Sequence, residues 1–324
     1  MNWTCTMPGG RLVGMEPLEP LEAPEPRAPL APPALHGIHV PLITPFAADG
    51  SVALDALEGL ARDVLAQGAT GLVALGTTGE PATLDEAERQ AVVGVLSRVA
   101  REHGAHLTVG AGSSDTRRSV GALAALDGVA DAALVTVPAF VRAGGPGVLA
   151  HFRHLAAHSP VPLVVYHVPH RTGQPLGADV LGALLRLPNV AGLKYATGGL
   201  DEAAVELLGA GHDGVMAGDD TYLSPMLALG AAGGIPASAH LATARHAELA
   251  DAWGKGDTDR ARELGHRLAA LARAAFAEPN PAVVKGVLHA RGRIPTPDVR
   301  LPLLPATAPA VAAALERLAA LDED

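Results

Sequence analysis

Short apolar runs alternate with longer amphipathic stretches along this chain from Leu35 onward. Short apolar runs are typical of buried parallel strands, and apolar residues spaced three and four apart are typical of helices. About eight such pairs follow one another, which favours an α/β fold of the (β/α)8 barrel type over an open doubly wound sheet. We expect the strands at 38–43, 71–75, 106–110, 132–137, 162–166, 190–194, 214–217 and 232–236.

The same pattern divides the chain into three parts. Residues 1–34 are rich in proline, which removes backbone donors, so this segment is predicted to be a disordered tail. Residues 35–254 are predicted to form the barrel. Residues 255–324 carry further helix patterns and are predicted to be a C-terminal helical extension packed on the barrel. Within the barrel, Thr83 followed by Glu86 has the spacing of a capping box and predicts the start of a helix.

Composition excludes several classes of function. The formal net charge is −10 and only 18% of residues are charged, so we expect no nucleic-acid partner. No run approaches the roughly 18–20 apolar residues of a membrane span, so we expect no membrane partner and a soluble protein. The single cysteine, Cys5, offers neither a disulfide framework nor a cysteine-based metal site. A cytoplasmic protein is therefore predicted.

In a (β/α)8 barrel the reactive groups lie where the strands end, and one lysine is placed there. The chain strongly prefers arginine, with only Lys194, Lys255 and Lys285 among 24 basic residues. Lysine, unlike arginine, can lose its proton and attack as a neutral amine. Lys194 ends an apolar run and is the candidate nucleophile. From its position alone, Lys194 could instead be a strand-end lysine that reaches solvent or pairs with a carboxylate.

Three other groups, at two strand ends, are suited to an acidic substrate. Tyr166 ends the strand before Lys194, where its phenol could relay protons or could simply cap the core. The turn Gly76-Thr77-Thr78-Gly79-Glu80 offers backbone N–H groups and two hydroxyls to a carboxylate, although such a turn can be only a turn. Arg171 could hold a second carboxylate with two hydrogen bonds, or be an ordinary surface residue.

Several motifs in this order carry a family resemblance. They are VPLITPFAADG at 40–50, GTTGEPATL at 76–84, YHVPHRTG at 166–173, GLKYATG at 192–198, AGDD at 217–220 and FAEPNPAVVKG at 276–286. From about Gly37 to Pro305 the chain resembles the dihydrodipicolinate synthase and N-acetylneuraminate lyase family of class I, Schiff-base-forming lyases. The resemblance implies a barrel with a C-terminal helical extension, assembled as a homo-oligomer, either a tetramer or a dimer.

The resemblance also implies roles for particular residues. Lys194 would form an imine with the keto carbon of pyruvate or another 2-oxo acid. Thr77 and Thr78 would hold the carboxylate of that acid and pass protons, and Tyr166 would shuttle a proton at the imine. Ile235 falls where the family uses a backbone carbonyl near the lysine, although Pro236 departs from the usual pattern. This chemistry needs no metal and no cofactor, because the imine itself withdraws electrons.

Arg171 and Phe140 bear on the second substrate. Arginine at this position is implied to bind the carboxylate of the aldehyde partner, as in the synthase branch, which joins pyruvate to aspartate semialdehyde. Phe140 stands where synthases have a tyrosine that reaches into a neighbouring subunit's site, so that hydroxyl is missing. The alternatives are another aldolase or dehydratase for 2-oxo acids, such as 4-hydroxy-2-oxoglutarate or a sugar acid, and a non-catalytic barrel that binds 2-oxo acids.

Four further departures are interpreted within the resemblance. His167 and Tyr195 replace an asparagine and a commonly acidic residue, and they leave the identity of the substrate open. Glu86 and Arg89 stand where lysine-inhibited members often carry histidines, so the sequence does not support feedback by lysine.

Two polar clusters remain outside this interpretation. His151, His154 and His158 share a helix face, but without a carboxylate we assign them no metal. Asp219 and Asp220 are expected to cap the helix that follows the seventh strand.

Overall fold

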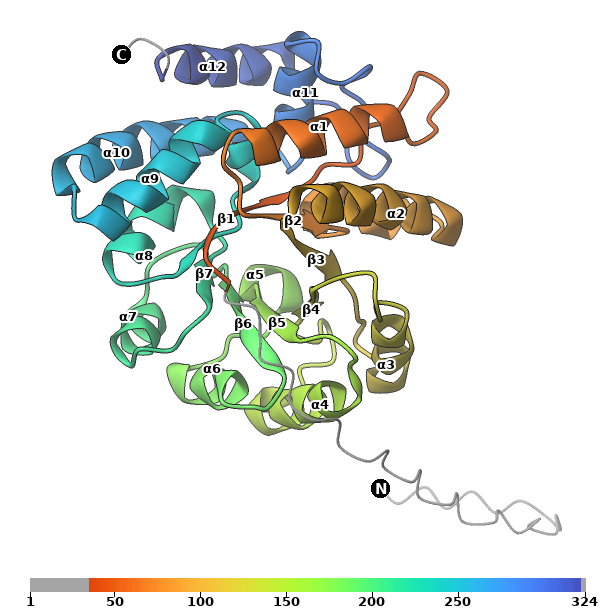
Figure 1. Ribbon diagram of the computed structural model, residues 1–324, viewed down its shortest axis with the longest axis vertical. Coiled ribbons are helices and arrows are strands. Elements are labelled where there is room, and N and C mark those ends of the chain that lie inside the picture. The colour runs from red at the N-terminus through yellow and green to blue at the C-terminus, as the bar shows by residue number, and fades with distance from the viewer. Residues whose placement is uncertain (1–34, 322–324) are drawn as a thin grey trace, which may run out of the picture.

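The computed structural model describes residues 35–321 and contains a closed parallel barrel of eight strands in chain order (Figure 1). The predicted fold class is confirmed. The predicted tail at 1–34 lies outside the described residues. The strands are β1 Gly37–Pro41, β2 Gly71–Ala74, β3 His106–Gly110, β4 Ala132–Thr136, β5 Leu163–His167, β6 Val190–Tyr195, β7 Val215–Ala217 and β8 Gly233–Gly234.

Helices follow the strands and surround the barrel (Figure 1). No helix among residues 35–321 combines the length and apolar character needed to cross a membrane. The helices around the barrel are α1 Leu54–Ala66, α2 Glu86–His103, α3 Thr116–Ala124, α4 Gly144–His158, α5 Pro169–Thr172, α6 Ala178–Leu185, α7 Glu202–Gly209, α8 Leu223–Ala228 and α9 Thr243–Lys255, with short 3₁₀ turns η1 Thr77–Gly79, η2 Pro81–Thr83, η3 Asp220–Tyr222 and η4 Ala237–His240.

Three helices after the barrel form a layer on one side of it (Figure 1). They are α10 Thr258–Ala275, α11 Ala282–Ala290 and α12 Ala308–Ala319. Helices α10 and α11 pack on each other and on α12, and both contact η4 after β8. The extension therefore lies against the loops at the ends of the strands. The domain boundary after residue 254 stays a prediction.

Alternation along each strand separates two apolar clusters. Successive side chains of a strand point to opposite faces, so one set fills the barrel and the other packs under the helices. In β5 and β6, Val164 and Tyr166 belong to the inner cluster, whereas Val165, Leu193 and Tyr195 belong to the outer one. A residue's place in this alternation decides whether it can reach the mouth of the barrel.

Glycine closes the barrel between its first and last strands. Strand β8 consists of Gly233 and Gly234, which pair with Gly37 and Ile38 of β1. A Cβ atom on Gly233 would lie 2.0 Å from the carbonyl oxygen of Gly37. No larger residue fits there without moving a strand. Of the strand predicted at 232–236, the structure has only Gly233–Gly234.

The start of α2 differs from the prediction. Asp85, and not Thr83, is the N-cap residue, and its side chain accepts a hydrogen bond from the Glu88 N–H, while the Glu88 side chain accepts one from the Asp85 N–H. Thr83 instead donates its hydroxyl to the Glu80 carbonyl inside a 3₁₀ turn. The sequence therefore predicts the start of α2 two residues too early, because Thr83 belongs to the 3₁₀ turn that precedes the helix.

Two histidines lie at the amino-terminal end of the barrel. His39 of β1 and His106 of β3 flank Gly71, and their ring centroids are 5.2 Å apart. His39 is 1% exposed, and burial, followed by the nearby His106, lowers its pKa to about 3. A charged imidazole is therefore unfavourable in the folded chain.

Acid is expected to destabilise the fold through His39. Its pKa lies below the ordinary value of about 6.5, so the unfolded chain binds the proton first as the pH falls, and stability present above pH 6.5 is progressively lost. At pH 5 the loss from this group is about 2 kcal/mol. Urea unfolding at pH 7 and pH 5 should show a smaller loss for His39→Asn than for the unchanged chain. Replacing the exposed His266 in the same way is the control, and an equal loss in all three proteins contradicts this account.

Candidate active site

Two adjoining cavities open at the carboxyl ends of the strands. A small cavity of about 60 Å³ surrounds Lys194, and a larger one of about 980 Å³ lies beside it. The two share Thr77, Tyr166, Arg171 and Asn280. Polar groups converge on the small cavity, which places the candidate chemistry there.

Lys194 and Tyr166 are neighbours on adjacent strands. They are paired in register between β5 and β6, so both side chains point into the barrel mouth. Each residue is only 7% exposed, and the Lys194 Nζ lies 4.7 Å from the centroid of the Tyr166 ring. The arrangement puts an amine and a phenol together in a small cavity where both residues are largely buried.

Both threonines of the turn after β2 line the small cavity, and they differ in exposure. Thr77 is exposed, whereas Thr78 is 4% exposed and its hydroxyl accepts a hydrogen bond from Nδ2 of Asn280 at 3.0 Å. The Thr44 hydroxyl donates to the carbonyl of Gly79 at 2.7 Å and fixes the turn from below. Gly76 caps the turn and its carbonyl accepts from the Gly79 N–H.

Arg171 and Ile235 complete the predicted set. Arg171 lies in α5, is exposed and lines both cavities, and among residues 35–321 its side chain has no hydrogen-bond or ionic partner. Ile235 follows β8, lines the small cavity and donates its N–H to the carbonyl of Ala217 at 2.8 Å. The predicted residues therefore gather at one mouth, and their roles stay predictions.

Asp219 and Asp220 line the small cavity; Asp219 holds the N-cap position of η3, but neither side chain makes a capping hydrogen bond, contrary to expectation. The Asp219 carboxylate accepts from the N–H of Gly198 at 2.7 Å, and that of Asp220 accepts from the N–H of Ser238 at 2.5 Å. Burial raises the pKa of both, and the hydrogen bonds that the two carboxylates accept oppose the shift more than the charge of Lys194 does. They tie the loop after β7 to its neighbours and place two acids beside the lysine.

Tyr195 and His167 point away from the site. Both belong to the opposite alternation from Lys194 and Tyr166, so they lie between strands and helices, where their rings are 5.8 Å apart. The Tyr195 hydroxyl donates to Asp201, which caps α7. Reading these two departures as evidence on the substrate was therefore wrong, because neither side chain lines either cavity.

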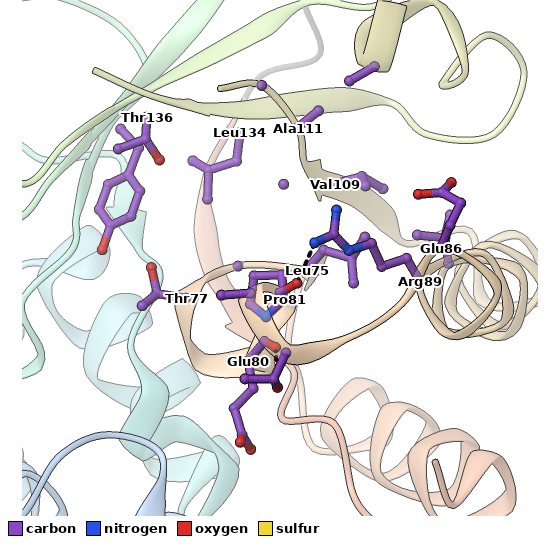
Figure 2. Close-up of a pocket in the computed structure, with 18 of the residues that line it drawn as sticks. Leu75, Thr77, Glu80, Pro81, Glu86, Arg89, Val109, Ala111, Leu134 and Thr136 are labelled. Atoms are coloured by element: carbon purple, nitrogen blue, oxygen red, sulfur yellow. Dashed lines mark hydrogen bonds between the residues drawn. The ribbon is translucent and has the colours of Figure 1, made fainter. Parts of the chain in front are cut away.

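The larger cavity has polar groups where it adjoins the small one and is lined mainly by apolar side chains elsewhere. Figure 2 shows Leu75, Val109 and Leu134 on its walls, with Arg89 reaching inward from α2. One Arg89 nitrogen, Nη2, donates to the carbonyl of Pro81 at 2.7 Å, and Glu86 lies farther along the same wall. Glu86 and Arg89, which stand where lysine-inhibited relatives often carry histidines, thus line this cavity and not the small one.

Phe140 stands out on the surface near Arg171. It is 93% exposed, has a left-handed backbone with φ of 66°, and donates its N–H to the carbonyl of Thr172. A bulky residue with positive φ is uncommon, as is a fully exposed phenylalanine. In the single chain Phe140 contributes to neither cavity.

The three histidines of α4 do not converge. The ring of His151 shares a hydrogen bond with the Thr116 hydroxyl at 2.9 Å, whereas His154 and His158 stack with centroids 4.2 Å apart. Within residues 35–321, no three His, Cys, Asp or Glu side chains are grouped so that they could hold a metal ion.

Sequence reasoning missed two cavity residues from the C-terminal extension. Phe276 and Asn280 both line the small cavity, although they lie beyond the last strand. Both residues belong to the FAEPNP motif, which the sequence does show. The expectation that site residues lie at strand ends does not place this motif at the site, because it follows the last strand. Asp219 and Asp220 did follow a strand, and the same rule should have placed them at the site.

Comparison with known proteins agrees with the fold and the motifs. Residues 34–319 match the model of the dihydrodipicolinate synthetase family. The 4-hydroxy-tetrahydrodipicolinate synthase of Methanothrix thermoacetophila is 38% identical over 272 residues, covering 83% of this chain and 91% of that protein. The enzyme of the same name from Pseudomonas aeruginosa is 37% identical over 271 residues, covering 82% and 91%.

Solved structures show the same likeness. The dihydrodipicolinate synthase of Acinetobacter baumannii, solved in complex with pyruvate, is 33% identical with a TM-score of 0.83, covering 88% of this chain and 99% of that one. The dihydrodipicolinate synthase of Thermotoga maritima is 28% identical with a TM-score of 0.84, covering 89% and 98%.

Proposed function

The chain belongs to the dihydrodipicolinate synthetase family, and from this premise we propose that it is a lyase-type enzyme that binds pyruvate as a Schiff base on Lys194. The second substrate in this proposal is aspartate semialdehyde, as for the 4-hydroxy-tetrahydrodipicolinate synthases that it resembles. The single observation that carries it is the pairing of Lys194 with Tyr166 in the barrel mouth, beside the Thr77–Thr78 turn.

The proposed reaction begins when neutral Nζ of Lys194 attacks the keto carbon of pyruvate. Tyr166 supplies a proton to the departing hydroxyl, so that water leaves and an imine forms. Loss of a proton from the methyl carbon gives an enamine, because the iminium nitrogen accepts the electron pair. The enamine carbon attacks the aldehyde carbon, which forms the new carbon–carbon bond. Water, or the amino group of the aldehyde partner, then attacks the imine carbon and displaces Nζ as a free amine, and the proton released returns to Tyr166.

Carboxylate recognition is divided between two places in this proposal. The carboxylate of pyruvate is held at the Thr77–Thr78 turn, where Gly76 begins a run of backbone donors, and Ile235 lines the same small cavity. The carboxylate of the aldehyde is held by Arg171, whose guanidinium has no partner within residues 35–321. No metal or cofactor enters this scheme.

A different 2-oxo-acid aldolase or dehydratase is the second candidate, and Phe140 is the observation that favours it. A phenyl ring cannot pass a proton, so a relay that depends on a tyrosine here is interrupted. A barrel that binds 2-oxo acids without turning them over is the third candidate, and the retained Lys194 opposes it.

Restoring the hydroxyl should distinguish these candidates. Phe140→Tyr is expected to raise kcat/KM for condensation of pyruvate with aspartate semialdehyde by at least about tenfold, because a positioned acid–base group contributes about 10² to 10⁴ in rate. Phe140→Leu, which also lacks a hydroxyl, is the matched control and should give no gain. No gain with tyrosine would assign Phe140 to the pocket of a different substrate.

The proposal extends to assembly and location. We propose a homo-oligomer, either a tetramer or a dimer, since the exposed Phe140 and Val141 lie side by side near the site and would be covered by a neighbouring subunit. The setting is the cytoplasm, consistent with a chain that carries a single cysteine.

Borohydride trapping tests the central step. Borohydride reduces an imine to a stable amine, so incubation with pyruvate should add a pyruvate-sized mass to the peptide that contains Lys194. Lys194→Ala should take up no such mass. A folded protein that gives no adduct overturns the pyruvate proposal and favours another 2-oxo acid or the non-catalytic barrel.

A further inference from the structure

Glu80 joins the two 3₁₀ turns that follow β2. It ends η1 and precedes η2 with a left-handed backbone, φ 53° and ψ 40°, which is uncommon for a residue with a side chain. The residue is 5% exposed, and Figure 2 shows its carboxylate directed away from the cavity interior. Glu80 therefore acts on the far side of the turn from Thr77.

Both carboxylate oxygens of Glu80 are bound by the C-terminal extension. Oε1 accepts from Nζ of Lys285 at 2.5 Å, and Oε2 accepts from the N–H of Arg300 at 2.9 Å. These partners lie more than two hundred positions later in the sequence. The turn that carries Thr77 and Thr78 is thus fastened from outside the barrel.

Lys285 is fully buried in α11 and lines neither cavity. Besides Glu80, its ammonium donates to the carbonyl of Asp298 at 2.9 Å and lies 4.0 Å from the centroid of the Phe46 ring. Burial lowers the pKa of Lys285 to about 8, and the Glu80 carboxylate opposes the shift. A buried charge is costly unless it is paired, and here one ion pair spans the junction of barrel and extension.

Asn280 reaches the same turn from the cavity side. Its Nδ2 donates to Oγ1 of Thr78 at 3.0 Å, while its buried Oδ1 has no partner within residues 35–321. Since the Thr78 oxygen accepts this bond, the Thr78 hydroxyl proton is left for another acceptor. A carboxylate in the small cavity would be such an acceptor.

We propose that Lys285, acting through Glu80, and Asn280, acting through Thr78, are positioning residues that set the affinity of the Thr77–Thr78 turn for the carboxylate of the 2-oxo acid. The inference rests on the proposed function, because it assumes that this turn holds that carboxylate. It gives the extension a role in substrate binding, which a purely structural layer of helices would lack.

Steady-state kinetics of three variants tests this role. Lys285→Met and Glu80→Gln each remove one partner of the ion pair, and Asn280→Ala removes only the bond to Thr78. We expect the KM for pyruvate to rise about tenfold or more in Lys285→Met and Glu80→Gln, because each loses a hydrogen bond between charged groups. In Asn280→Ala, which loses one neutral hydrogen bond, we expect a rise of about threefold or more. The KM for the aldehyde should stay within about twofold, because Arg171 is not attached to this turn.

A matched control breaks an ion pair between the barrel helix α9 and the extension that does not touch the turn. Glu248→Gln disrupts contacts between α9 and α10, where Glu248 accepts from Arg245 and Arg260, and it should leave both KM values unchanged. Equal pyruvate KM values in the unchanged chain, Asn280→Ala and Glu80→Gln overturn the proposal. A parallel rise of both KM values in those two variants also overturns it, since it would indicate a general loss of structure. These two variants decide the question if Lys285→Met does not fold.

Hydrogen exchange separates this inference from the proposed function. In the substrate-free protein, Glu80→Gln should speed amide exchange within residues 77–84 at least about tenfold and leave α4 unchanged. Unchanged exchange there shows that Glu80 does not hold the turn, whatever reaction the protein catalyses. Faster exchange in a chain that never captures pyruvate under borohydride would instead mean that the proposed function has failed and that only the fastening of the turn stands.

Discussion

Turnover should fall by at least about 10⁴ when Lys194 is replaced by arginine, a loss of the size found when covalent nucleophiles are removed. Arginine keeps the positive charge and the long side chain, but it does not lose its proton and so cannot attack a keto carbon. Because Lys194 lines the small cavity beside Tyr166, the exchange tests nucleophilicity while retaining a cation in the mouth. Product formation from pyruvate and aspartate semialdehyde is the measurement.

The control uses one of the other lysines. Lys255 is exposed at the end of α9 and pairs with Asp251, so Lys255→Arg should leave turnover unchanged. Circular dichroism and the thermal midpoint would show that both variants are folded. A folded Lys194→Arg protein that retains a tenth or more of the activity would rule out a covalent role for this residue.

Loss of the Tyr166 hydroxyl is the second large effect. Tyr166→Phe keeps the ring over which the Lys194 ammonium lies, at 4.7 Å from the centroid, and removes only the group that can pass a proton. A positioned acid–base group contributes about 10² to 10⁴ in rate, so kcat should fall by that factor. Pyruvate binding should change little, because the Thr77–Thr78 turn is untouched. Rapid-quench borohydride trapping would measure the slower imine formation directly.

Tyr222 provides the comparison for this change. It lies in η3 beside the site, is half-buried and lines neither cavity, so Tyr222→Phe should alter kcat by less than about twofold. If Tyr166→Phe behaves the same way, water or another group relays the proton, and the proposed role of Tyr166 is wrong.

The barrel was predictable because each strand is short, apolar and followed by an amphipathic stretch, which is a local signal. Lys194 and Tyr166 were predictable because a (β/α)8 barrel brings the ends of its strands together, so two residues in separate strands meet without any contact being known in advance. The register confirms that they are neighbours.

Tertiary contacts without a local pattern could not be predicted. Nothing in the sequence near Glu80 indicates that Lys285 and Arg300 bind its carboxylate, because that contact requires the fold of the extension. The outward direction of Tyr195 could have been inferred from alternation, once Lys194 was placed inward. That inference was missed because the residue was judged from the family pattern alone.

The long separation between Glu80 and its partners sets an order for biosynthesis. A ribosome has made all eight strands before it reaches Lys285 and Arg300, so the sheet can close while the turn that carries Thr77 and Thr78 is still untethered. The nascent barrel would then have Lys194 and Tyr166 in place, while the carboxylate-binding turn at Thr77 and Thr78 is not yet held by the extension. Full affinity for the substrate would be reached only after Lys285 and Arg300 have been made, so a chain terminated before them would share the sheet of the complete protein and bind the carboxylate more weakly.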